Sequence, residues 1–98
     1  MVEIKKTKPN EFQFLVKSET GNILLESVPF SDKRTVESTI KKLCISNASN
    51  KYVERKTNFE GKFLFNLKNE EGTIIGSSGF YGSEAGMENG IKNLKSSL

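Results

Sequence analysis

The sequence predicts an α+β domain in which one mostly antiparallel six-stranded sheet carries two helices on one of its faces. Residues 61–94 can be laid over residues 10–43 without a gap, at an offset of 51 positions. Within each copy, three segments alternate apolar and polar residues as strands do, and a fourth has the longer apolar period of a helix. Two tandem strand-strand-strand-helix repeats, related by an approximate two-fold axis, are therefore expected.

The internal repeat consists of residues of the same type 51 positions apart. The apolar matches are Phe12 with Phe63, Phe14 with Phe65, Ile23 with Ile74, Ile40 with Ile91, and Leu43 with Leu94. The other matches are Lys17 with Lys68, Gly21 with Gly72, Ser27 with Ser78, and Glu37 with Glu88. We therefore predict a single domain over residues 1–98, with a first repeat at 1–49 and a second at 50–98.

In the first copy, strands are expected over residues 2–8, 11–18 and 23–28. Pro9-Asn10 separates the first two, because proline presets its backbone angle and asparagine tolerates tight bends. Gly21 can adopt the positive φ that the next short reversal requires. In the second strand, alternation gathers the apolar side chains of Phe12, Phe14 and Val16 on one face.

A helix is expected after Pro29, where Val36, Ile40 and Leu43 fall on one stripe. Ser31 or Asp32 can cap its first turn by accepting a hydrogen bond from an unpaired backbone N–H. Residues 46–50 are small and polar, which predicts the connection between the copies.

The second copy repeats this order, with strands expected over residues 52–57, 62–68 and 73–78 and a helix over 84–95. Its helix stripe consists of Met87, Ile91 and Leu94. Neither copy can bury its apolar surface unless its helix packs on its sheet. Side-by-side pairing of the copies also protects one open sheet edge of each, so a single sheet is expected.

The composition argues against several classes of function. The chain has no histidine and a single cysteine, Cys44, so it lacks the commonest general base and cannot form an internal disulfide. We therefore expect no enzyme activity, no metal and no other cofactor. The opening residues are charged where a secretory signal is apolar, and no apolar run could span a bilayer. These features predict a cytoplasmic protein without a membrane partner.

One candidate site is the small-residue segment 76–83, which precedes the second helix. Free N–H groups at a helix N-terminus can bind an anion, so Gly82 and Ser83 are candidate anion ligands. Lys33 and Arg34 are further candidates, because cations in the first turn oppose the helix dipole and a bound anion would offset them. The segment lacks the P-loop pattern, and turn formation, capping and ordinary surface charge explain these residues as well.

A second candidate site is the face of the sheet that the helices leave uncovered. Alternation places there the side chains of Gln13, Leu15, Lys17, Leu64, Asn66 and Lys68. This mixed apolar and basic surface favours a non-catalytic interaction or ligand-binding module, with a protein, a peptide or a second copy of the chain as partner. The sequence does not name the partner.

Weak binding of nucleic acid by the same basic face is the alternative function. Tyr52 would stack on bases, and phosphate contacts would come from Lys5, Lys17, Lys56 and Lys68. The net charge is +3, but the lysines alternate with glutamates and form no polybasic block, which argues against this function.

The second copy has a spaced pattern of aromatic, glycine and isoleucine positions. These positions are Phe63, Phe65, Gly72, Ile74, Ile75, Ser78, Tyr81, Asn89, Gly90 and Ile91. The pattern resembles that of the YegP-like family of small, uncharacterised bacterial proteins. The first copy fits less closely, with Ser38-Thr39 in place of Asn-Gly. The resemblance implies the duplicated fold, leaves open whether the units exchange a strand, and implies no reaction.

Overall fold

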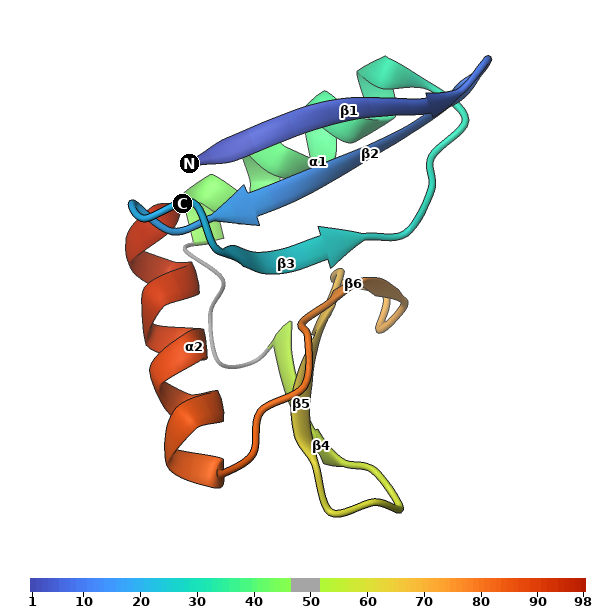
Figure 1. Ribbon diagram of the computed structural model, residues 1–98. Coiled ribbons are helices and arrows are strands. Elements are labelled where there is room, and N and C mark those ends of the chain that lie inside the picture. Colours follow the sequence, from blue (N-terminus) through green and yellow to red (C-terminus); the bar gives the residue numbers. More distant parts are fainter. Residues whose placement is uncertain (47–51) are drawn as a thin grey trace.

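The computed structural model describes residues 1–46 and 52–98, which form a six-stranded sheet and two helices (Figure 1). The first half of the chain contributes β1 (Val2–Lys8), β2 (Glu11–Lys17), β3 (Ile23–Ser27) and α1 (Lys33–Ser46). The second half contributes β4 (Val53–Thr57), β5 (Phe63–Lys68), β6 (Ile74–Ser77) and α2 (Glu84–Ser97). Apart from Ser46, which ends α1, the connection predicted over residues 46–50 lies outside the described residues.

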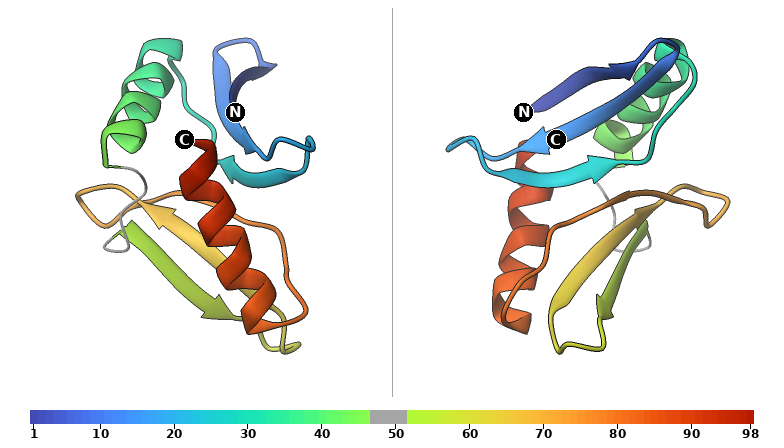
Figure 2. Two further views of the ribbon diagram at one scale, coloured as in Figure 1. Left: turned by 90° about the vertical axis from the view of Figure 1, so that its left-hand side faces the viewer. Right: turned by 45° about the vertical axis from the view of Figure 1, so that its right-hand side comes forward.

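All strand pairings are antiparallel, and the strand order β1-β2-β3-β6-β5-β4 places the two halves side by side. The halves join where Glu26 pairs with Ser77 and Ser27 with Gly76. The sheet twists strongly, so that β4 and β5 run across the direction of β1 and β2 (Figures 1 and 2). The predicted fold class, α+β with one antiparallel six-stranded sheet, is confirmed.

The core lies on the face of the sheet that carries Phe14 and Phe65, both of which are fully buried. The helices complete one apolar cluster through their buried residues Val36, Leu43, Met87, Ile91 and Leu94. Helix α1 packs on β2, whereas α2 contacts β5 and also β2 and β3 (Figure 2). Because α2 contacts strands of both halves, the two halves share one core.

The two halves repeat the same local geometry around their central phenylalanines. The Phe14 N–H donates to Ser27 Oγ over 2.8 Å, and the Phe65 N–H donates to Ser78 Oγ over 2.9 Å. Among the turns, Gly21 and Gly72 have φ angles of 89° and 82°. The division into repeats at residues 1–49 and 50–98 stays a prediction, because its boundary lies outside the described residues.

The halves differ where an aromatic ring lies over each helix. A Cβ atom added at Gly90 would lie 2.2 Å from the Tyr81 hydroxyl oxygen and 2.6 Å from its Cζ, so only glycine leaves room for this ring. The corresponding residues in the first half are Phe30 and Thr39. The second helix thus needs glycine at position 90 because the Tyr81 hydroxyl packs there, whereas Phe30 carries no hydroxyl group and the first helix has Thr39 at the corresponding position.

Replacing Phe14 or Phe65 by Ala should lower the free energy of unfolding by about 3 to 5 kcal/mol, because each change leaves a cavity in the shared core. Urea denaturation followed by circular dichroism measures this loss. Phe59→Ala is the matched control, since Phe59 is 97% exposed and its removal should leave stability nearly unchanged. Near-wild-type stability of both core variants would contradict the packing described above.

Gly90→Ala should destabilise the protein by about 1 to 3 kcal/mol, because the added methyl group overlaps the Tyr81 ring. Gly86→Ala, one turn earlier on α2, is the control. Its Cβ would lie 3.1 Å from Ser83 Oγ and 3.8 Å from the nearest Tyr81 atom, an ordinary contact, so alanine's better helix propensity should offset the closer approach to Ser83. Thermal unfolding compares the two variants. In a Tyr81→Leu background, Gly90→Ala should destabilise the protein much less. An unchanged loss of stability would show that contact with Tyr81 does not cause it.

Candidate functional site

The face of the sheet opposite Phe14 and Phe65 carries a continuous row of side chains, one from each strand. The strand pairings align Glu3, Leu15, Glu26, Ser77, Asn66 and Glu54 in this order. Because side chains alternate between the faces of a strand, all six project away from the core side. The row therefore crosses both halves and places a glutamate on each edge strand.

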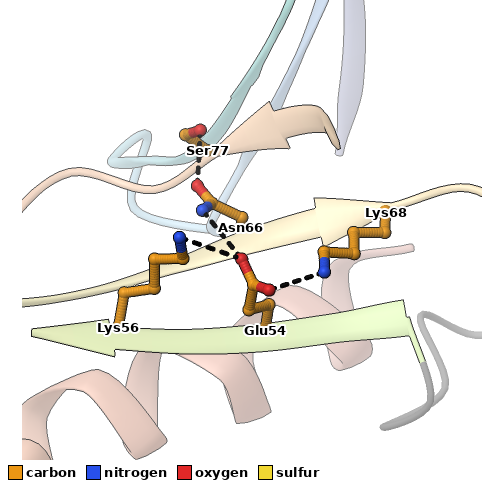
Figure 3. A network of polar contacts seen from close by, with 5 residues as sticks. All are labelled: Glu54, Lys56, Asn66, Lys68 and Ser77. Atoms are coloured by element: carbon orange, nitrogen blue, oxygen red, sulfur yellow. Dashed lines mark hydrogen bonds and ion pairs between the residues drawn. The ribbon is translucent and has the colours of Figure 1, made fainter. Parts of the chain in front are cut away.

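In the second half, this row forms a polar network around Glu54 (Figure 3). The Glu54 carboxylate forms ion pairs with Lys68 Nζ at 2.5 Å and with Lys56 Nζ at 3.6 Å. The Asn66 amide donates to Glu54 Oε1 over 3.4 Å and accepts from Ser77 Oγ over 2.7 Å. The hydrogen bond from Lys68 is the main cause that lowers the pKa of Glu54 below its ordinary value.

In the first half, the polar side chains of the same face are also engaged with one another. Lys17 Nζ lies 3.0 Å from Glu3 Oε2, the same arrangement as Lys68 with Glu54. The Gln13 amide donates to the Ser27 carbonyl oxygen over 2.9 Å. Leu15 stands where the second half has Asn66. Both halves thus neutralise a lysine with a glutamate on the edge strand beside it.

The structure places the predicted surface residues on this face but leaves them less accessible than the sequence suggests. Leu15 and Asn66 are each only 6% exposed, and Lys17 and Lys68 are held in ion pairs. Leu64 is half-buried, and Tyr52 packs against the core. Alternation identifies the face of a strand but does not show which neighbours cover a side chain. Partner binding by this face stays a prediction.

The candidate anion ligands lie at the starts of the two helices, which are at opposite ends of the molecule (Figures 1 and 2). The structure therefore does not bring Lys33 and Arg34 together with Gly82 and Ser83. The Asp32 carboxylate accepts the Arg34 N–H over 2.9 Å, and Ser83 Oγ accepts the Gly86 N–H over 3.0 Å. Both helix starts are capped by their own side chains, and anion binding there stays a prediction.

Strands β1 and β4 form the two edges of the sheet. The Lys17 N–H donates to the Met1 carbonyl oxygen over 2.8 Å, and bonded residues alternate along an antiparallel pair. The outward-facing N–H and C=O groups of β1 are therefore those of Val2, Ile4 and Lys6. At β4, the Asn58 N–H donates to the Lys62 carbonyl oxygen. By the same alternation, the N–H and C=O groups of Val53, Arg55 and Thr57 point away from the sheet.

The two edges differ in how their charges are compensated. On the β4 edge, Arg55 forms a two-pronged ion pair with Glu88 of α2, in which Nε contacts Oε1 and Nη2 lies 3.1 Å from Oε2. This contact raises the pKa of Arg55 and lowers that of Glu88. On the β1 edge, Lys5, Lys6 and Lys8 are exposed and form no ion pair within the described residues. This contrast could not be predicted from the sequence, because the Arg55–Glu88 pair joins residues far apart in the chain.

Two further features of the surface have no assigned role. Phe59, at the tip of the β4–β5 hairpin, is 97% exposed, and Phe80, before α2, is 68% exposed. A pocket of about 220 Å³ lies between α1 and the β5–β6 turn, and its lining includes Thr39, Lys42 and Glu71. This pocket mixes both charges and offers no donor set typical of one ligand.

No cluster of three or more metal-ligating side chains occurs within residues 1–46 and 52–98. Neither of the described helices has the length and apolar character needed to cross a membrane. The cytoplasmic location stays a prediction.

Comparison with known proteins identifies relatives over most of the chain. Residues 60–97 match the family model described as "Domain of unknown function (DUF1508)". The chain is 34% identical to UPF0339 protein YegP of Escherichia coli strain K12 over 95% of its length and 84% of the relative's. It is 32% identical to a UPF0339 protein encoded in the ptx operon 5′ region of Stutzerimonas stutzeri, with the same coverage.

Two solution NMR structures share the fold. The structure of YegP from E. coli, described as a protein of unknown function, superimposes with a TM-score of 0.87 and covers 96% of this chain and 81% of its own. A UPF0339 protein from Shewanella oneidensis, 27% identical, has a TM-score of 0.89 and covers 97% of this chain and 80% of its own. The YegP-like resemblance predicted from the spaced aromatic, glycine and isoleucine residues is confirmed.

The Glu54 carboxyl group should titrate at a lower pH than an ordinary glutamate, because Lys68 stabilises its charged form. Lys68→Met should move the Glu54 pKa back towards the ordinary value, whereas Lys92→Met on α2 should leave it unchanged. Carbon-detected NMR titration of the glutamate side chains measures both. Since the folded-state pKa is lowered, the pair stabilises the fold above the ordinary glutamate pKa and loses this effect as the pH falls through the lowered value. An unchanged Glu54 pKa in Lys68→Met would refute the assignment.

Proposed function

Because this chain belongs to the YegP-like UPF0339 family, whose function is unknown, we propose a function from its geometry. It is a non-catalytic module that binds an extended peptide segment of a partner protein. The segment adds to the sheet as a further strand at an open edge. The main-chain groups of the edge strand supply the hydrogen bonds, and neighbouring side chains select the sequence.

The observation that carries this proposal is the pair of open edges. Three residues of β1 and three of β4 turn their N–H and C=O groups away from the sheet, in the alternating arrangement that a further strand requires. Peptides bind to other small domains by adding a strand at such an edge.

A non-catalytic role agrees with the state of the carboxylates. Glu54 and Glu88 have lowered pKa values because Lys68 and Arg55 hold their charged forms. A general acid or base at neutral pH needs the opposite shift, towards pH 7. The chain also has no histidine to supply that role.

The alternative of nucleic-acid binding by the uncovered face has less support. Lys17, Lys56 and Lys68 are each paired with a glutamate, which reduces the positive field that phosphate groups would meet. Tyr52 is half-buried and packs against the core, so less of its ring is open to stack on a base.

Selection of a random twelve-residue peptide display library on the folded protein should enrich extended peptides. Amide NMR spectra of the ¹⁵N-labelled protein then locate their binding. We expect the largest shifts at one set of outward-facing edge residues, either Val2, Ile4 and Lys6 or Val53, Arg55 and Thr57.

Two outcomes would contradict the proposal. The first is that no peptide is enriched over a library passed over a blank surface, or that the enriched peptides shift residues of the helices instead of either edge. The second is that the protein shifts single-stranded RNA in an electrophoretic assay at low salt and that Lys17→Gln and Lys68→Gln lose this shift. That result would favour the nucleic-acid alternative.

A further inference from the structure

We infer that β1 is the edge that binds, and that its partner is an extended segment with two adjacent acidic residues. This inference rests on the proposed function and names the site and the chemistry of the ligand. It follows from the charges along β1, from the directions in which they project and from the contrast with β4.

Strand β1 has more positive charge than its surroundings compensate. Its lysines Lys5, Lys6 and Lys8 are exposed and lack an ion pair within the described part of the chain. The one carboxylate on the strand, Glu3, already lies 3.0 Å from Lys17 Nζ of β2. A partner strand along this edge would therefore meet three cations whose charges are available for pairing.

Strand β4 lacks this excess. Arg55 is held by Glu88, and Lys56 lies 3.6 Å from Glu54. An acidic strand at β4 would have to compete with these internal carboxylates. Charge complementarity thus distinguishes two edges that both turn main-chain N–H and C=O groups outward.

The directions of the lysines define the pattern of the partner. Lys5 and Lys6 are neighbours in a strand, so Lys5 projects to the uncovered face and Lys6 to the helix face. An added strand can pair with both when it carries acidic residues at two consecutive positions. Val2 and Ile4 are half-buried on the helix face and pack against the core, so an apolar residue of the partner fits beside them.

A second copy of the chain fits this edge less well than an acidic segment. Pairing β1 with β1 of another copy would bring two sets of three lysines to one seam, and like charges across a strand pair are destabilising. Lysines on an edge strand commonly prevent such self-pairing. Here the same three side chains would reject a copy of β1 and attract a strand of opposite charge.

The probe is an eight-residue, capped peptide of strand-forming residues in which an apolar residue directly follows an adjacent pair of glutamates, so that in an antiparallel pairing the three face Lys6, Lys5 and Ile4. Titrated into ¹⁵N-labelled protein at low salt, it should shift the amides of Val2, Ile4 and Lys6 and protect them from hydrogen exchange. The amides of Arg55 and Thr57 on the opposite edge serve as an internal control and should not change.

Two control peptides separate strand addition from simple charge attraction. In the first, the glutamates are replaced by glutamines; in the second, alternate backbone nitrogens carry methyl groups, which retain the charge but remove the edge hydrogen bonds. Both should bind at least about tenfold more weakly, because each lacks one of the two sets of contacts. A tenfold loss corresponds to about 1.4 kcal/mol of binding free energy. Equal affinity of the methylated peptide would overturn strand addition.

Matched protein variants test the lysines. Lys5→Glu/Lys6→Glu should weaken binding about tenfold or more, whereas Lys41→Glu/Lys42→Glu makes the same change in net charge on α1 and should have a small effect. Lys5→Gln/Lys6→Gln provides a milder test if the double reversal unfolds the protein, and should weaken binding by a smaller factor. Equal losses in the β1 and α1 variants would show a general charge effect and overturn the inference.

The outcomes also separate this inference from the proposed function. Protection of Arg55 and Thr57 by the acidic peptide, without protection of Ile4 and Lys6, would retain binding at an edge but place it on β4. Absence of binding at either edge, by this peptide and by those selected from the library, would reject both.

Discussion

The structure depends on the short contact between β3 and β6. Two residue pairs there, Glu26 with Ser77 and Ser27 with Gly76, make one sheet from two sets of three strands. This contact aligns the core faces of the two halves, so that Phe14 and Phe65 are buried in one apolar cluster. Helix α2 contacts strands on both sides of the junction and covers it. Burial of apolar area, the main stabilising term in folding, is therefore shared between the halves.

The sequence was sufficient to predict the elements and the layers because these depend on local periodicity. The two-residue alternation around Phe14 and Phe65 identified core strands, and the stripe of Met87, Ile91 and Leu94 identified a covering helix. Glycines at positive φ marked two of the hairpin turns. Each of these signals acts over a few residues, which is why it can be read without coordinates.

The candidate surfaces were harder to predict because they depend on pairs of residues distant in the chain. Alternation placed Leu15 and Asn66 on the uncovered face, but their burial depends on the neighbouring strands and on the twist of the sheet. The compensation of Arg55 by Glu88 needs the packing of α2 beside β4. The excess charge of β1 is visible in the sequence as three lysines within four positions. Its significance appears only by contrast with β4.

The close fit of Tyr81 against Gly90 has a consequence for how the chain reaches its native arrangement. Two halves with like strands and like helices could in principle exchange helices during folding. A helix carrying Thr39 cannot replace α2 beneath Tyr81, because the space for a Cβ at that position is occupied by the ring. The ring thus acts as a steric check that rejects the wrong helix, a form of selection against misassembly that requires no additional stabilising contact.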